Sequence, residues 1–97
     1  MSDWRLDRIG SAARGENPTV LARLPAGLAV IGDVQWLPGY CLLLSEQVGV
    51  TRLSDLPLAK RVDYLTSMER LGSAVERACA DMDPEFRRIN LEILGNT

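Results

Sequence analysis

The sequence predicts an α+β domain in which an antiparallel sheet carries a short N-terminal helix and one long helix. Short apolar runs separated by glycine and proline lie between residues 20 and 45, which is typical of strands joined by turns. Between residues 57 and 80, apolar residues recur every three or four positions, which is typical of a helix with one buried face. The length of 97 residues and the 46% hydrophobic content indicate a single domain over residues 1–97.

The first predicted element is a short helix over residues 3–14. Ser2 or Asp3 stands where a side chain can cap the first turn, and apolar residues follow at helical spacing. Gly15 comes directly after the last helical position, where a glycine commonly ends a helix.

Three strands are expected at residues 20–24, 28–33 and 40–45. A turn over residues 25–27 joins the first two, and a loop containing Pro38 and Gly39 leads into the third. Because the second and third strands are apolar on both faces, both faces of this sheet need cover. We expect the long helix on one face and a partner or a ligand on the other.

The long helix is predicted over residues 57–80, with Ser54 or Asp55 as its cap and Asp83-Pro84 as its end. The two methionines in the predicted stripe are expected to fill the core. The apolar stripe consists of Leu58, Val62, Leu65, Met68, Leu71, Gly72, Val75, Cys79 and Met82.

A fourth strand is predicted over residues 86–94, where apolar and polar residues alternate. Ile89, Leu91 and Ile93 belong on the side of the long helix. Arg88, Asn90 and Glu92 then lie on the opposite face. This alternation places an amide and a carboxylate together on the face away from the helix.

The chain contains no histidine, the usual general base at neutral pH and a common metal ligand. Catalysis by Ser/His or Cys/His pairs and zinc sites that contain histidine are therefore excluded for the sequence as given. Cys41 and Cys79 stand in apolar surroundings without CxxC spacing, and we interpret them as reduced, buried thiols. We expect no catalytic residue, no metal site and no cofactor.

Charge and hydropathy limit the partners. The net charge is −2, and basic and acidic residues are interleaved, so the sequence offers no surface for nucleic acid. The N-terminus is charged from Asp3 onward, and no apolar run approaches the ~20 residues of a membrane span. We therefore expect a cytoplasmic protein without a membrane partner.

Asp33 closes the apolar run of the second strand and lies on the same side as Ile31. A carboxylate there is costly unless it is hydrogen-bonded or exposed in a cleft. One interpretation is a capping aspartate that binds the backbone of its own turn. The other is a carboxylate that binds a ligand.

The chain resembles the histidine-triad (HIT) superfamily. The resemblance rests on the order of helix, three strands, long helix and strand, and on the block 28–44 with Gly32-Asp33 and Pro38-Gly39. The N-terminal helix, followed by Gly15, and the run 88–97 are also similar, so the resemblance covers essentially the whole chain. It implies a half-barrel-like antiparallel sheet with helices packed on it, usually in a homodimer. It also implies binding of purine nucleotides, with hydrolysis or nucleotidyl transfer as in the dinucleoside polyphosphate hydrolases.

The resemblance assigns roles to five residues. Asp33 matches the acidic residue that hydrogen-bonds the ribose hydroxyls in this superfamily. Ile31, Gly32 and Val34 would flank the base, and Asn90 would approach the phosphates. The expected ligand is a weakly bound purine nucleotide.

The sequence departs from the superfamily at the catalytic motif. The His-x-His motif lies on a further strand, which is expected only after Thr97, so we interpret the chain as a HIT-like domain that ends before it. A histidine nucleophile forms the covalent nucleotidyl intermediate, and no residue here replaces it. The resemblance implies an enzyme, whereas the missing histidine predicts an inactive chain.

Two alternatives remain open. The chain can be a non-enzymatic α+β module that associates with itself or a partner through an exposed sheet edge or apolar face. It can also be an unrelated enzyme that relies on Asp33, Glu92 or a cysteine. For the homodimer, we expect the contact at the strand 86–94 or at a second stripe of the long helix, which consists of Tyr64, Leu71 and Ala78.

Overall fold

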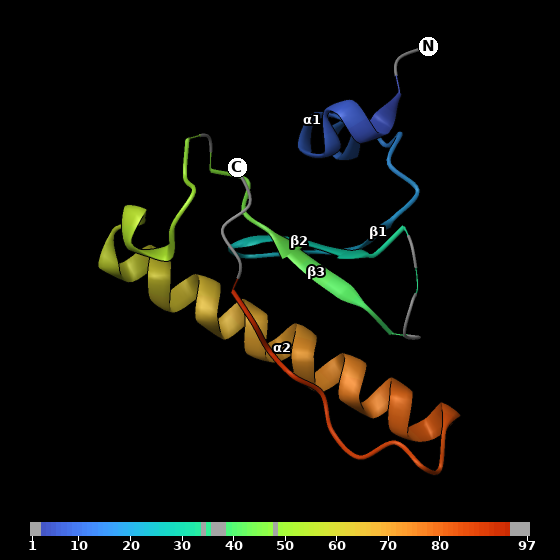
Figure 1. Ribbon diagram of the computed structural model, residues 1–97. Coiled ribbons are helices and arrows are strands. Elements are labelled where there is room, and N and C mark those ends of the chain that lie inside the picture. Colours follow the sequence, from blue (N-terminus) through green and yellow to red (C-terminus); the bar gives the residue numbers. More distant parts are fainter. Residues whose placement is uncertain (1–2, 34, 36–38, 48, 94–97) are drawn as a thin grey trace.

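The computed structural model describes residues 3–33, 35, 39–47 and 49–93. These residues form a three-stranded antiparallel sheet in the order β1-β2-β3, with helices packed around it (Figure 1). The predicted α+β class is therefore confirmed. In chain order, the elements are the 3-10 helix η1 (Trp4–Leu6), α1 (Arg8–Ala13), β1 (Val20–Leu24), β2 (Gly27–Ile31), β3 (Cys41–Leu44), the 3-10 helix η2 (Leu53–Asp55) and α2 (Leu58–Met82).

The strands follow the predicted runs, but the second and third are shorter. β1 has the predicted bounds and pairs with β2 from Leu24 opposite Gly27. Gly27 extends β2 into the predicted turn, where a larger side chain would collide with the carbonyl oxygen of Leu44. β2 ends at Ile31, which is opposite Cys41 at the start of β3.

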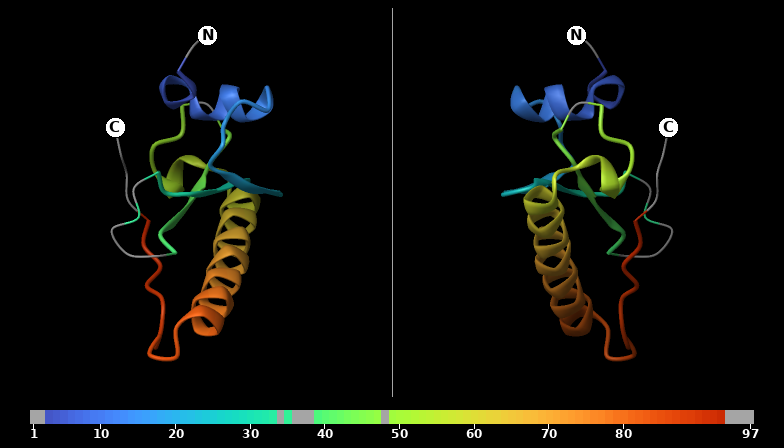
Figure 2. Two further views of the ribbon diagram at one scale, coloured as in Figure 1. Left: turned by 90° about the vertical axis from the view of Figure 1, so that its right-hand side faces the viewer. Right: turned by 90° about the vertical axis from the view of Figure 1, so that its left-hand side faces the viewer.

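The central strand of the sheet, β2, is covered on both faces by this chain itself. α2 lies on one face, and η1 and α1 lie on the opposite side of the sheet (Figures 1 and 2). Leu28, Ala29 and Val30 are consecutive in β2 and therefore point to alternate faces, yet each is at most 5% exposed. The expectation that a partner or a ligand covers the second face is wrong for β2, because the N-terminal segment lies there.

The predicted N-terminal helix is divided at Asp7. The carboxylate of Asp3 accepts a hydrogen bond from the Arg5 amide at 2.9 Å and caps η1. The carboxylate of Asp7 accepts one from the Gly10 amide at 3.0 Å and starts α1. Two capping aspartates four positions apart thus split one predicted helix into two short ones. Gly15 ends α1 as expected, with a positive φ of 73°.

α2 begins at Leu58, close to the predicted start, but the predicted cap is wrong. Pro57 occupies the N-cap position and has no polar side chain to offer. Asp55 instead belongs to η2, where its carboxylate accepts hydrogen bonds from the amides of Thr51 and Arg52. The end is as predicted: Asp83 terminates the helix and its amide donates to the Cys79 carbonyl.

Only part of the predicted apolar stripe of α2 is covered. Leu58, Val62, Leu65 and Met82 are exposed. The covered side carries Tyr64, Ser67, Met68, Leu71, Gly72, Val75 and Cys79. A 25-residue helix is about 37 Å long, whereas strands of four or five residues are about 15 Å long, so both ends of α2 extend past the sheet. Met82 is therefore not core filler, and Tyr64 and Leu71 are not free for a second stripe.

The predicted fourth strand is not formed in the part of the chain that the structure describes. Residues 86–93 are extended and run back alongside α2 without strand pairing (Figures 1 and 2), and Leu94 lies outside the described residues. Methyl groups of Ile89 and Leu91 lie 3.1 and 2.9 Å from the position of a Cβ at Gly72. The predicted orientation of these two side chains toward α2 is thus confirmed, although Leu91 remains 52% exposed.

Among the described residues, no helix combines the length and the apolar character that a membrane span requires.

Candidate functional site

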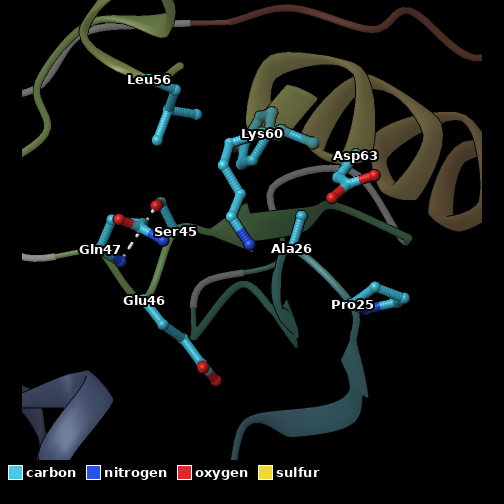
Figure 3. A pocket seen from close by; sticks show the side chains of 9 residues that line it. Pro25, Ala26, Ser45, Glu46, Gln47, Leu56, Lys60 and Asp63 are labelled. Carbon is cyan, nitrogen blue, oxygen red and sulfur yellow. Dashed lines mark hydrogen bonds between the residues drawn. The ribbon is translucent and has the colours of Figure 1, made fainter. Parts of the chain in front are cut away.

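Two hollows in the described residues lie away from Asp33. One, of about 70 Å³, is lined by residues on the turn before β2, after β3 and at the start of α2, including Ser45, Lys60 and Asp63 (Figure 3). A more open hollow of about 470 Å³ lies at residues 84–87. Ligand pockets for small molecules usually enclose about 300–1,000 Å³, so the smaller hollow cannot hold a nucleotide.

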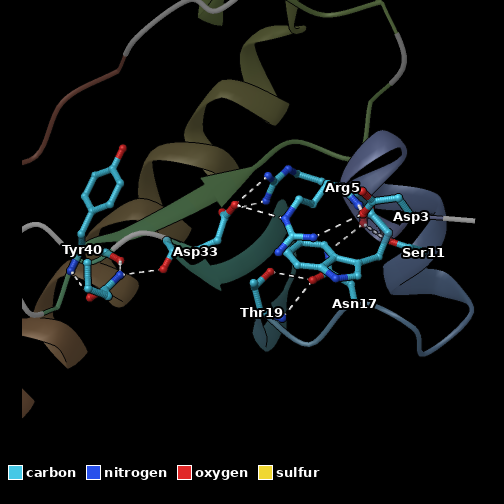
Figure 4. A network of polar contacts seen from close by, with 11 residues as sticks. Asp3, Arg5, Ser11, Asn17, Thr19, Asp33 and Tyr40 are labelled. Atoms are coloured by element: carbon cyan, nitrogen blue, oxygen red, sulfur yellow. Dashed lines mark hydrogen bonds and ion pairs between the residues drawn. The ribbon is translucent and has the colours of Figure 1, made fainter.

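Asp33 lies two residues beyond β2, where the chain bends away from the strand. Its carboxylate is held by Arg8 of α1 in a two-pronged ion pair. Figure 4 shows Asp33 in the polar network that also contains Arg5. Nη1 of Arg8 donates to Oδ1 at 3.0 Å, and Nη2 donates to Oδ2 at 3.1 Å. This geometry matches the fork of a guanidinium to both oxygens of one carboxylate. The interpretation of Asp33 as a cap of its own turn is therefore incomplete, because its main partner is 25 residues away.

A second guanidinium and an indole ring complete the cluster around Asp33. Nε of Arg5 lies 3.8 Å from Oδ2 of Asp33. The guanidinium carbons of Arg5 and Arg8 lie 4.4 and 5.1 Å from the centre of the Trp4 ring. Arg5 and Arg8 are three residues apart, and both reach the same carboxylate and the same ring. We call Trp4, Arg5, Arg8 and Asp33 the Asp33 cluster.

Buried hydrogen bonds fix the backbone of Arg8. Its carbonyl accepts from the Ser11 hydroxyl and from the side-chain Nδ2 of Asn17, each at 3.1 Å. The Asn17 side-chain oxygen in turn accepts from the amide and the hydroxyl of Thr19 at 2.9 and 2.6 Å. The Thr19 carbonyl accepts from the Ile31 amide, two residues before Asp33. Ser11, Asn17 and Thr19 are buried, so these polar groups need the partners that they find here.

The cluster keeps the Asp33 carboxylate ionised. The hydrogen bonds from Arg8 are the main cause that lowers the pKa of Asp33, and a backbone hydrogen bond and the charges of Arg8 and Arg5 act in the same direction. The same hydrogen bond raises the pKa of Arg8. The side chains of Arg8 and Asp33 are 33% and 34% exposed, so the pair stays open to solvent.

The residues next to Asp33 hold the end of the hairpin between β2 and β3. The Gly32 amide donates to the Tyr40 carbonyl at 2.8 Å, and Gly32 lies so close to the Tyr40 ring that a Cβ there would collide with it. Nε2 of Gln35 donates to the carbonyls of Gly32 and Tyr40, both at 2.8 Å. Oε1 of Gln35 accepts from the amides of Gly39 and Tyr40. Ile31 ends β2 and is partly exposed.

The five predicted ligand residues are only partly brought together. Ile31, Gly32 and Asp33 are consecutive at the end of β2, and Val34 lies outside the described residues. Asn90 is exposed on the unpaired segment beside α2, and no hydrogen bond joins it to the Asp33 cluster within the described ranges. Sequence reasoning missed Arg5, Arg8 and Gln35 as parts of this site. The spacing of three between two arginines on a predicted helix was the available signal, because such residues share a helix face.

The described residues hold no cluster suited to a metal ion, and the Cys41 thiol is not activated by its surroundings. Cys41 and Cys79 are free and half-buried. Burial raises the pKa of the Cys41 thiol, and the neighbouring Cys79 adds to this shift, so Cys41 is protonated and weakly nucleophilic at neutral pH. In the described part of the chain, no three cysteine or acidic side chains are grouped closely enough for a metal ion.

Comparison with protein families, with curated proteins and with solved structures finds no match to this chain.

Proposed function

We propose that this chain is a HIT-like nucleotide-binding protein that takes the ribose of a purine nucleotide or a dinucleoside polyphosphate at Asp33. One observation supports the proposal most directly. Asp33 is an ionised, solvent-accessible carboxylate at the end of a buried strand, at the position where the resemblance expects a ribose ligand. An ionised carboxylate accepts hydrogen bonds at about four lone-pair positions, which suits the two hydroxyls of a ribose.

The surroundings of Asp33 suit a nucleotide in two further respects. Ile31 is partly exposed beside it and offers an apolar contact for a base. The guanidinium groups of Arg5 and Arg8 lie beside Asp33 and would offer positive charge to the phosphate of a nucleotide. The proposal includes a cytoplasmic location, which the two free cysteines support.

We propose binding without turnover for the chain as given. The 97 residues contain no histidine, and the pKa of Cys41 is shifted against thiolate formation. A nucleotidyl transfer through a covalent intermediate needs an activated nucleophile. Purified protein is expected to leave dinucleoside polyphosphates intact, as checked by chromatography of the nucleotides. Clear turnover by pure, sequence-verified protein would contradict this part of the proposal.

Titration calorimetry with AMP and GMP tests the binding site. We expect weak binding by the unchanged protein and a loss of at least about ten-fold in Asp33→Asn, because a hydrogen bond to a charged group is lost. Asp81→Asn is the matched control. It removes the same charge from an exposed position near the end of α2, away from Asp33. No heat with either nucleotide, or equal affinities for all three proteins, would contradict a ribose site at Asp33.

Self-association is a second proposed function, and one observation favours it. Leu58, Val62 and Leu65 are exposed side chains at positions i, i+4 and i+7 of α2, so they form one apolar stripe on a helix surface. We call these three residues the exposed α2 stripe. An exposed apolar surface of this kind is typical of a contact with another chain.

A further inference from the structure

We propose that Arg8 is a built-in competitor for the nucleotide, because it occupies the edge of Asp33 that a ribose diol needs. This inference rests on the proposed ribose site at Asp33. It adds a form of regulation: the N-terminal segment holds the site closed until the ligand displaces one side chain. We call the Arg8–Asp33 ion pair the Arg8 latch.

The geometry of the ion pair carries the first step. Both Asp33 oxygens accept from Arg8, one from each terminal nitrogen, at 3.0 and 3.1 Å. The fork of the guanidinium therefore faces the open edge of the carboxylate. A cis-diol that gives one hydroxyl to each oxygen approaches through the same edge. A carboxylate has about four acceptor positions, but Arg8 takes the two that face this edge, so a diol that approaches through the same edge must displace Arg8.

The backbone of Arg8 is held in place, whereas its side chain is open to solvent. The Arg8 backbone is fixed by Ser11 and Asn17, and its guanidinium stacks near the Trp4 ring. The Arg8 side chain is nevertheless a third exposed, so its guanidinium can rotate away from Asp33 without a change in the fold. Ion pairs with this much solvent contact are weak. The free energy of the Arg8–Asp33 ion pair is therefore large enough to lower the affinity for a weakly bound ligand and small enough for that ligand to displace Arg8.

A neutral nucleoside separates this competition from other effects of charge. AMP carries phosphate charge, so loss of Arg8 would also remove an attraction for it. Adenosine has the diol and no phosphate, and it meets Arg8 only as a competitor. 2′-Deoxyadenosine lacks one of the two hydroxyls, so it cannot replace both hydrogen bonds that Arg8 donates to Asp33. Its affinity should therefore not depend on Arg8.

Binding of adenosine to Arg8→Met tests the latch. Methionine keeps an unbranched stem and removes the charge and all five donors of the guanidinium. We expect adenosine to bind about three- to five-fold more tightly than to the unchanged protein, which corresponds to the release of an exposed ion pair. The affinity for 2′-deoxyadenosine should stay the same. Raising the salt concentration should tighten adenosine binding in the unchanged protein and have no such effect in Arg8→Met.

Two control variants complete the experiment. Arg14→Met removes a guanidinium that pairs with Glu16 at 3.2 Å on the surface after the same helix, and it should leave adenosine binding unchanged. Arg8→Lys keeps the charge but cannot form a two-pronged pair, so its affinity should lie between those of the unchanged protein and Arg8→Met. If thermal denaturation shows that Arg8→Met does not fold, the Arg8→Lys comparison decides.

The failures are distinguishable. If Asp33→Asn loses adenosine while Arg8→Met binds it equally or less tightly, the ribose site stands, and Arg8 orients Asp33 instead of competing for it. If neither the unchanged protein nor any variant binds adenosine or AMP, the proposed nucleotide site is contradicted, and so is the proposed competition by Arg8.

Discussion

Asp33 can remain charged at the end of β2 because Arg8 and Arg5 stabilise its carboxylate. The folded protein therefore binds the proton of Asp33 less readily than the unfolded chain does. This difference links the stability of the domain to pH. The ion pairs of Asp33 with Arg8 and Arg5 also join the N-terminal segment to the end of β2.

We predict that the stability difference between the unchanged protein and Asp33→Asn disappears in acid. The pKa of Asp33 in the folded protein is lowered from its ordinary value of 3.8, so its contribution is fully present above that value. The contribution is lost as the pH falls through the folded pKa. Urea denaturation at neutral pH and at several pH values below about 4 measures this. A difference that persists unchanged at the lowest pH would contradict the ion pair as its source.

The Tyr64 hydroxyl gives a second prediction at the residue scale. It donates to the Leu43 carbonyl at 2.6 Å and joins α2 to β3. Burial raises the pKa of Tyr64, so the hydroxyl keeps its proton at neutral pH. Tyr64→Phe should cost about 1 kcal/mol of unfolding free energy. Tyr40→Phe is the control, because the Tyr40 hydroxyl has no partner within the described ranges and its ring is half exposed. Equal losses would show that the hydrogen bond adds nothing.

At the residue scale, the sequence could predict Asp33 as a candidate site residue, but it could not predict which side chains pair with Asp33. A carboxylate at the end of an apolar strand needs stabilisation, and that need is visible in the sequence. The choice of Arg8 depends on how α1 lies against the end of β2, which the buried Ser11–Asn17–Thr19 hydrogen bonds decide. No spacing along the chain reveals contacts 25 residues apart.

At the scale of elements, α2 shows what periodicity can and cannot predict. The three-to-four spacing predicted the helix and Asp83-Pro84 predicted its end, because both signals are local in the sequence. The covered face depends on the sheet beneath it, which is too short to cover both ends of α2. Residues 86–93 show the same limit. Their alternation placed Ile89 and Leu91 toward α2, but strand pairing needs a neighbouring strand edge in register.

The two ends of the predicted stripe can be compared directly. Val75 lies on the covered side of α2, 3.6 Å from the position of a Cβ at Gly39, whereas Met82 is 76% exposed. Val75→Glu should lower the unfolding free energy by about 2 kcal/mol or more, because a charge enters an apolar contact. Met82→Glu should change it by no more than about 0.5 kcal/mol. Denaturant unfolding of both variants is the measurement, and equal costs would place Met82 in the core after all.

At the scale of the whole molecule, a small core supports a long exposed helix. In the described ranges, the fully covered apolar side chains are few and centre on β2, namely Leu28, Ala29, Val30 and Leu56. Among the described residues, β1 and β3 each have one edge without a strand partner in this sheet. Domains of this size are stable by only about 5–10 kcal/mol. Association with a second copy would cover apolar surface that the chain leaves open.

We therefore predict a homodimer at micromolar concentration, with the exposed α2 stripe of Leu58, Val62 and Leu65 at the contact. Two such stripes can pack against each other as helices do, and the apolar area removed from water supplies the free energy of association. Val62→Glu places a charge in the centre of this contact and should shift the protein to monomers. Met82→Glu, at the far end of the same helix, should leave the dimer intact. Sedimentation velocity over a range of concentrations distinguishes the species. A folded monomer at all concentrations would contradict the dimer, whereas a dimer that survives Val62→Glu would move the contact to residues 86–93 or to a sheet edge.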